Sequence, residues 1–85
     1  MGEAQLNKPY QPISCELHSQ YELAIMHKNK LCLSWLKEGE TVTEKNITPV
    51  DVVTKNKAEF LVVNTSSENN VFIRLDHIVE MRVLN

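Results

Sequence analysis

Glycine is scarce in this sequence, and its scarcity excludes one class of site. The 85 residues include two glycines, Gly2 and Gly39, far apart in the chain. Loops that cradle nucleotide phosphates need several closely spaced glycines, because glycine lets the backbone approach the phosphate and adopt positive φ angles. The sequence therefore predicts no phosphate-binding loop.

Metal-ligand motifs are missing as well. The imidazoles and thiols belong to His18, His27, His77, Cys15 and Cys32. They form neither a CxxC pair nor the spacing of a zinc finger. We therefore expect no metal site and no cofactor. The two cysteines are far apart, and we expect reduced thiols rather than a disulfide.

One pair of side chains raises the question of catalysis. Cys15 and His18 are three residues apart, so on a helix the imidazole could act as a base toward the thiol. The favoured interpretation is a thiol in the core and an imidazole on the surface. The chain is accordingly not predicted to be an enzyme.

The sequence has no excess of basic over acidic residues. Nine lysines and arginines face eleven aspartates and glutamates, which gives a net charge of -2. Proteins that hold a polyanion non-specifically present clustered positive charge. Two small basic spots, Lys28 with Lys30 and Lys55 with Lys57, are expected to be solvated turn lysines, with phosphate contacts as the alternative. Direct binding of nucleic acid is not expected.

Long apolar runs are lacking too. No segment approaches the roughly 18–20 apolar residues of a membrane span. The first residues, MGEAQLNKPYQP, do not show the basic-then-apolar order of a signal peptide. The sequence predicts a cytoplasmic protein without a membrane contact.

What is present begins with an arm and a helix. Residues 1–12 have no hydrophobic period and are expected to form an extended or flexible arm before a single domain, residues 13–85. Ser14 stands where a helix N-cap belongs, and the helix is expected to end near Asn29. Apolar residues then follow at helical spacing. They are Leu17, Tyr21, Ala24 and Ile25.

From residue 31 the hydrophobic period changes to two, which predicts about five strands. A tight hairpin is expected at residues 37–40, and Pro49 is expected to end the central part of the second strand. Residues 50–57 combine an extended pattern with a turn signal. The aromatic side chains Trp35, Phe60 and Phe72 are expected in the core. The fold class predicted is mostly β, a helix followed by a small five-stranded antiparallel barrel.

The stretch FIRLDHIVEMRV, residues 72–83, looks like the second signature of Sm-type RNA-binding proteins. Arg74 and Asp76 are expected on opposite sides of a bend, where they can pair or cap backbone groups. Sm proteins usually carry glycine directly after the arginine, whereas this chain has Leu75. A strand that bends to close a barrel is therefore favoured over a ribonucleotide pocket.

Several blocks, in order, resemble one bacterial family, the Rof-type Rho-binding antiterminators. The blocks are YQPISCE (10–16), ELA (22–24), LKEGE (36–40), EFLVV (59–63) and RLDHI (74–78). The resemblance implies an Sm-like barrel with an N-terminal helix. It also implies a non-enzymatic inhibitor of transcription termination that binds the N-terminal OB-fold domain of the hexameric Rho helicase. There it would occupy the primary RNA sites and block RNA loading.

The expected contact with Rho runs from the end of the arm through the first helical turns. Its residues are Tyr10, Gln11, Ser14, Glu16, Ser19 and Glu22. A competitor for a basic, aromatic RNA groove should present carboxylates and hydrogen-bonding groups beside an apolar anchor. The free protein is expected to be a monomer. Two alternatives stay open, an Sm-like RNA-binding module that oligomerises through its barrel edges and a generic adaptor for another protein.

Overall fold

The computed structural model describes residues 13–84. One α-helix is followed by strands that are all antiparallel to their neighbours. The elements are α2 (Cys15–Met26), β1 (Leu31–Lys37), β2 (Glu40–Lys55), β3 (Ala58–Asn64), β4 (Val71–Arg74), the 3-10 helix η1 (Leu75–His77) and β5 (Ile78–Val83). The predicted fold class, mostly β with an N-terminal helix and five antiparallel strands, is confirmed.

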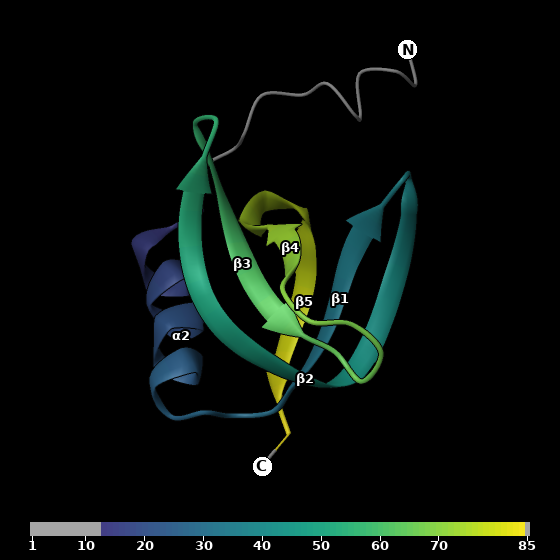
Figure 1. Ribbon diagram of the computed structural model, residues 1–85. Coiled ribbons are helices and arrows are strands. Elements are labelled where there is room, and N and C mark those ends of the chain that lie inside the picture. Colours follow the sequence, from purple (N-terminus) through teal and green to yellow (C-terminus); the bar gives the residue numbers. More distant parts are fainter. Residues whose placement is uncertain (1–12, 85) are drawn as a thin grey trace.

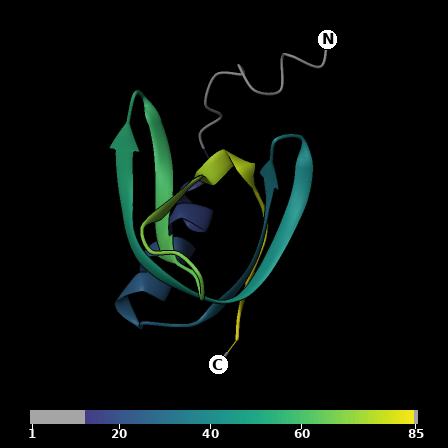
Figure 2. The same cartoon turned by 45° about the vertical axis from the view of Figure 1, so that its right-hand side comes forward.

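The sheet is strongly bent. Its strand order is β4-β3-β2-β1-β5, so the two outermost strands are β4 and β5. These two strands are joined by the three residues of η1, which brings the opposite edges of the sheet close together (Figure 1). No β4–β5 pairing is recorded between residues 13 and 84. Turned by 45°, the structure shows the β1–β2 hairpin and the β2–β3 hairpin running apart from the bend in β2 (Figure 2).

The long strand β2 belongs to both halves of the sheet. Its first part pairs with β1 as far as Ile47, and its second part pairs with β3 from Thr48 onward. The prediction that Pro49 ends the central part of this strand is wrong, because β2 continues through it to Lys55. Pro49 sits beside a register shift, where a missing N–H disturbs the ladder least. Asn46, with φ of 59°, lies in the separate register shift of the β1–β2 ladder, just before β2 changes partner.

Two tight turns connect the strands. The predicted hairpin is confirmed, with Glu38 and Gly39 at φ of 54° and 83° between β1 and β2. Asn56 and Lys57 join β2 to β3 with φ of 51° and 65°. Two consecutive positive φ angles match the twist of antiparallel strands. Residues 50–57 therefore contain both predicted structures: the chain is extended as far as Lys55 and turns at Asn56 and Lys57.

The helix begins as predicted and ends slightly earlier. The Ser14 hydroxyl accepts a hydrogen bond of 3.1 Å from the Leu17 N–H. At the other end, Lys28, one residue before the expected end at Asn29, adopts the left-handed conformation with φ of 55°. The Lys28 and Asn29 N–H groups donate to the carbonyls of Ile25 and Ala24 at 3.1 and 3.0 Å. These two bonds form a Schellman motif with lysine in place of glycine.

The core lies between α2 and the concave side of the sheet. Tyr21 and Ala24 are buried, as the predicted helical stripe requires. They pack with residues of the strands and η1. These residues are Leu31, Leu33, Trp35, Ile47, Leu61, Val63, Ile73 and Leu75. Burial raises the pKa of the Tyr21 phenol, because the charged form is poorly solvated there.

The burial of Phe72 and of Cys15 differs from the prediction. Trp35 is buried as expected, but Phe72 is 46% exposed. Phe72 lies on the short edge strand β4, where one face is uncovered. Cys15, expected in the core, is exposed, because it precedes the first buried turn of the helix. Cys32 is buried, and both thiols are free.

Candidate partner-binding face of the helix

The predicted contact residues fall into two groups. Ser14, Glu16, Ser19 and Glu22 are all exposed, at or just after the start of α2. The structure brings these four together on one short segment. Tyr10 and Gln11 lie outside the described residues.

Sequence reasoning missed two apolar side chains on the outer face of α2. Leu23 is 49% exposed and Met26 is 71% exposed. Together with Glu16 and Ser19 they follow at intervals of three or four residues, so they share one face of the helix. The signal was present in the sequence, because neither residue belongs to the predicted core stripe. We call Glu16, Ser19, Leu23 and Met26 the outer face.

The charge of α2 is entirely negative apart from its histidine. The helix contains Glu16 and Glu22 and no lysine or arginine. Glu16 lies in the first turn, where the helix dipole favours a carboxylate. Ser14 already uses its hydroxyl oxygen to cap the helix. Ser14 is therefore a structural residue as well as an exposed one, and its hydroxyl hydrogen stays available for a partner.

His18 connects α2 to the sheet through contacts with two carboxylates. Its Nε2 lies 3.4 Å from a Glu59 carboxylate oxygen on β3, and its Nδ1 lies 3.6 Å from a Glu22 carboxylate oxygen. The side chain is about three-quarters buried, so the imidazole is not the surface group that the sequence suggested. His18 is directed toward these carboxylates, which explains its position better than a catalytic pair with Cys15.

A shallow hollow of about 310 Å³ lies between α2 and β2. Its lining residues are Glu22, Ile25, Met26, Asp51 and Val52. The hollow adjoins the outer face at Met26. A partner that covers Met26 therefore finds both an apolar contact and the carboxylates of Glu22 and Asp51.

The predicted bend at Arg74 and Asp76 is confirmed and is an ion pair. Arg74 donates from Nε and Nη2 to the two Asp76 carboxylate oxygens at 3.0 and 2.7 Å. The Asp76 side chain is only 8% exposed. A guanidinium that is held in this way orients the turn between β4 and β5. The geometry favours the structural interpretation of this stretch.

The basic spots are at turns, as predicted. Lys30 donates from Nζ to the Thr48 hydroxyl at 2.6 Å. Lys55 lies at the end of β2, with its Nζ 5.0 Å from the centre of the Phe72 ring. That contact is a cation–π interaction on the surface. Neither spot extends into a continuous basic stripe along α2.

Among residues 13–84, no group of three or more His, Cys, Asp or Glu residues is arranged to hold a metal ion. None of the helices in this part of the chain has the length and apolar content that a bilayer crossing requires.

Comparison with known proteins identifies the family to which the chain belongs. Residues 12–85 match the family described as modulator of Rho-dependent transcription termination (ROF). The chain is 38% identical over 73 residues to the protein rof of Escherichia coli (strain K12) and to that of Shigella flexneri. Each alignment covers 86% of this chain and 81% of the relative.

A solved structure shares the fold. It is the proteasome accessory factor B/C (PafBC) of Arthrobacter aurescens, with a TM-score of 0.69 and 17% identity over 94% of this chain. The match spans 14% of that protein, so it concerns the fold alone. The match of the family over residues 12–85 decides the assignment: the chain belongs to the Rof family of modulators of Rho-dependent transcription termination.

Proposed function

We propose that this protein inhibits Rho by occupying the primary RNA-binding sites of the Rho N-terminal OB-fold domain, so that transcripts cannot load. The observation that carries the proposal is the outer face of α2. There the carboxylate of Glu16 shares one helix face with two exposed apolar side chains, Leu23 and Met26, which lie about two and three turns further along a helix without lysine or arginine.

The physical argument starts from the groove to be blocked. A groove that holds single-stranded RNA combines basic side chains with stacking or apolar groups. A protein competitor needs carboxylates for the basic groups and apolar surface for the rest. The outer face of α2 supplies both, with the carboxylate in the first turn and the apolar side chains in the second half of the helix. Glu22 adds a second carboxylate, and Ser19 adds a hydroxyl between them.

We extend the contact to Tyr10 and Gln11, which precede the helix in sequence. In the proposed complex, the tyrosine ring and the glutamine amide contact the entry of the groove. We also propose that the free protein is a cytoplasmic monomer, with residues 1–12 as an extended or flexible arm and residues 13–85 as one domain.

The test is competition on purified components. The chain should co-elute with hexameric Rho and displace a labelled pyrimidine-rich oligonucleotide at micromolar concentration. The displacement should saturate as inhibitor is added. If the two proteins elute separately at micromolar concentration, the proposal is wrong.

One observation favours a second candidate, direct binding of RNA. Phe72 is exposed, edge-to-face with Phe60 at a centroid distance of 6.1 Å, and Lys55 lies over its ring. Exposed aromatic rings beside cations stack on bases in single-strand binders. This candidate requires that the chain bind an oligoribonucleotide without Rho, with affinity that falls steeply with salt. Inhibition of Rho through α2 requires neither.

A further inference from the structure

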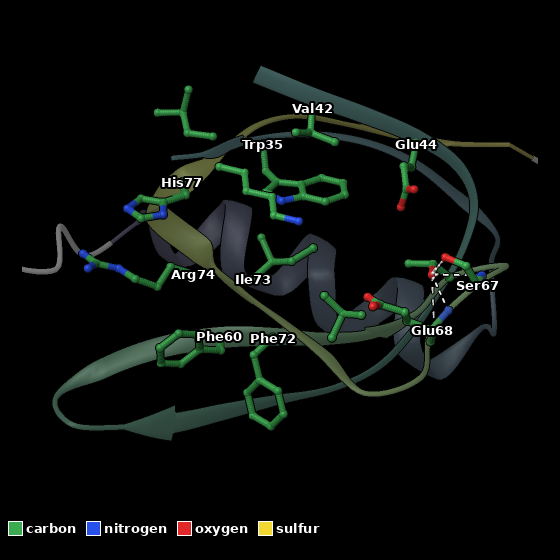
Figure 3. A pocket seen from close by; sticks show the side chains of 14 residues that line it. Trp35, Val42, Glu44, Phe60, Ser67, Glu68, Phe72, Ile73, Arg74 and His77 are labelled. Atoms are coloured by element: carbon green, nitrogen blue, oxygen red, sulfur yellow. Dashed lines mark hydrogen bonds between the residues drawn. The ribbon is translucent and has the colours of Figure 1, made fainter. Parts of the chain in front are cut away.

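A cleft of about 330 Å³ opens between the two halves of the sheet. Its size is at the lower end of the range for small-ligand sites. The lining residues come from β1 to η1 and the intervening loops, and none comes from α2. In Figure 3 the helix lies behind the cleft. The cleft is therefore separate from the outer face of α2.

The cleft has different chemistry at its two ends. Figure 3 shows Glu44 and Glu68 at one end and Arg74 and His77 at the other. Arg74 is already neutralised by its paired hydrogen bonds to Asp76. The carboxylates of Glu44 and Glu68 have no ion-pair partner among the described residues. Glu44 is half-buried, so its charge is screened less than that of an exposed carboxylate.

The space between these ends is apolar. Trp35 is 8% exposed and presents its indole to the cleft from β1, with Ile73 opposite (Figure 3). Phe60 and Phe72 belong to the lining as well, but in Figure 3 their rings lie on the far side of β4 from Trp35. The apolar wall is therefore formed by Trp35 and Ile73. Aromatic faces attract cations, and an aliphatic stem packs well against such a wall.

We propose that this cleft binds an alkylguanidinium or alkylammonium group, with the cation between Glu44 and Glu68 and its aliphatic stem against Trp35. Lys37, which also lines the cleft, is the positive charge that works against binding. A phosphate ligand fits poorly, because the unpaired charges of the lining are two carboxylates and one lysine.

The first test uses the full chain without substitutions. Trp35 is the single tryptophan of the sequence, so its fluorescence and its indole N–H resonance report directly on the cleft. Butylguanidinium should change both signals saturably, whereas butylurea, a neutral molecule of nearly the same shape, should change neither. Equal responses to the two compounds, or no response to butylguanidinium at millimolar concentration, would overturn the proposal.

Variants that remove a charge give a second test, because loss of a carboxylate should weaken binding and loss of the lysine should strengthen it. Glu44→Gln should weaken butylguanidinium binding about tenfold, because a charge-assisted hydrogen bond is lost. Glu68→Gln, at an exposed position, should weaken binding about threefold. Lys37→Gln should strengthen binding about twofold by removing repulsion. The matched control is Glu40→Gln, the same change on the same strand outside the cleft, which should have no effect.

The source of the cation is distinguished by two further probes. A capped arginine amide stands for a basic side chain of a protein, and spermidine stands for a free polyamine. Whichever binds the cleft more tightly identifies the source, and both depend on Glu44 if the proposal is correct. If instead an oligonucleotide perturbs Trp35 at lower concentration than either probe, the cleft is a nucleic-acid site and the proposal fails.

Discussion

Arg74 and Asp76 form a two-pronged ion pair across the turn that joins the two edge strands. The carboxylate is nearly buried, and the guanidinium is about four-fifths buried. Removing one partner takes two charge-assisted hydrogen bonds from a largely desolvated group, which costs more than the pair itself contributes.

Asp76→Asn should therefore lower the free energy of unfolding by about 2 kcal/mol. The measurement is urea unfolding at neutral pH. The matched control is Glu80→Gln, which breaks the exposed pair with Arg82 at 3.8 Å. That pair should contribute less than about 0.5 kcal/mol. Equal effects of the two substitutions would show that the Arg74–Asp76 pair contributes no more to stability than an exposed ion pair.

Glu16→Lys should weaken binding to Rho about tenfold, because it replaces a carboxylate by a cation at the proposed basic groove. Stability should change little, since Glu16 is exposed in the first turn and only its favourable interaction with the helix dipole is lost. Binding is measured by competition with the labelled oligonucleotide. Glu40→Lys, the same charge change on the β1–β2 hairpin, is the control and should bind normally. A melting temperature lowered by many degrees in Glu16→Lys would mean that Glu16 has a structural role instead.

Met26→Ala should also weaken Rho binding, by about tenfold if Met26 is an anchor of the interface. Its side chain contributes little to the core because it is 71% exposed, so the thermal unfolding curve should stay in place. Val79→Thr changes an exposed apolar residue on β5, away from the outer face, and serves as the control. If both variants compete with RNA as well as the unmodified chain does, the apolar part of the outer face is not used.

Because Tyr21 is buried, we expect the free energy of unfolding to depend on pH in the alkaline range. Burial raises the pKa of its phenol above 10.0. In the unfolded chain the phenol loses its proton near pH 10, whereas the folded protein keeps it to higher pH. The unfolded state then binds fewer protons, so the free energy of unfolding falls as pH rises above about 10 and is unaffected by this group below it.

The check is the difference between the unmodified chain and Tyr21→Phe. That difference should be constant below about pH 10, and above it the unmodified chain should lose stability faster. The substitution leaves lysines and Tyr10 unchanged, so their titration cancels. Parallel curves across pH 9–11 would contradict the assignment.

Local chemistry allowed much of this fold to be predicted. The N-cap at Ser14, the core stripe through Tyr21 and the hairpin at Gly39 depend on neighbours in sequence, and all three are confirmed. The prediction at Pro49 was wrong because β2 changes its partner strand next to this residue, so the missing N–H of proline does not interrupt the strand. That change depends on residues far away in sequence.

The candidate site was harder to predict. Helical spacing leaves Leu23 and Met26 outside the core stripe, but the exposure of Phe72 depends on which surfaces the rest of the fold covers, and its hydrophobicity alone suggests burial. The cleft joins Trp35 to Glu68 and His77, residues from separate strands and loops. Only the bend of the sheet brings them to one place.

The sharing of β2 by both halves of the sheet has a consequence for folding. Its first part holds β1 and its second part holds β3, so neither hairpin can detach without withdrawing a strand from the other. The fold should therefore melt in one cooperative step. Backbone amides near Ile47 and Thr48, where the two ladders meet, should be among the slowest to exchange with deuterium.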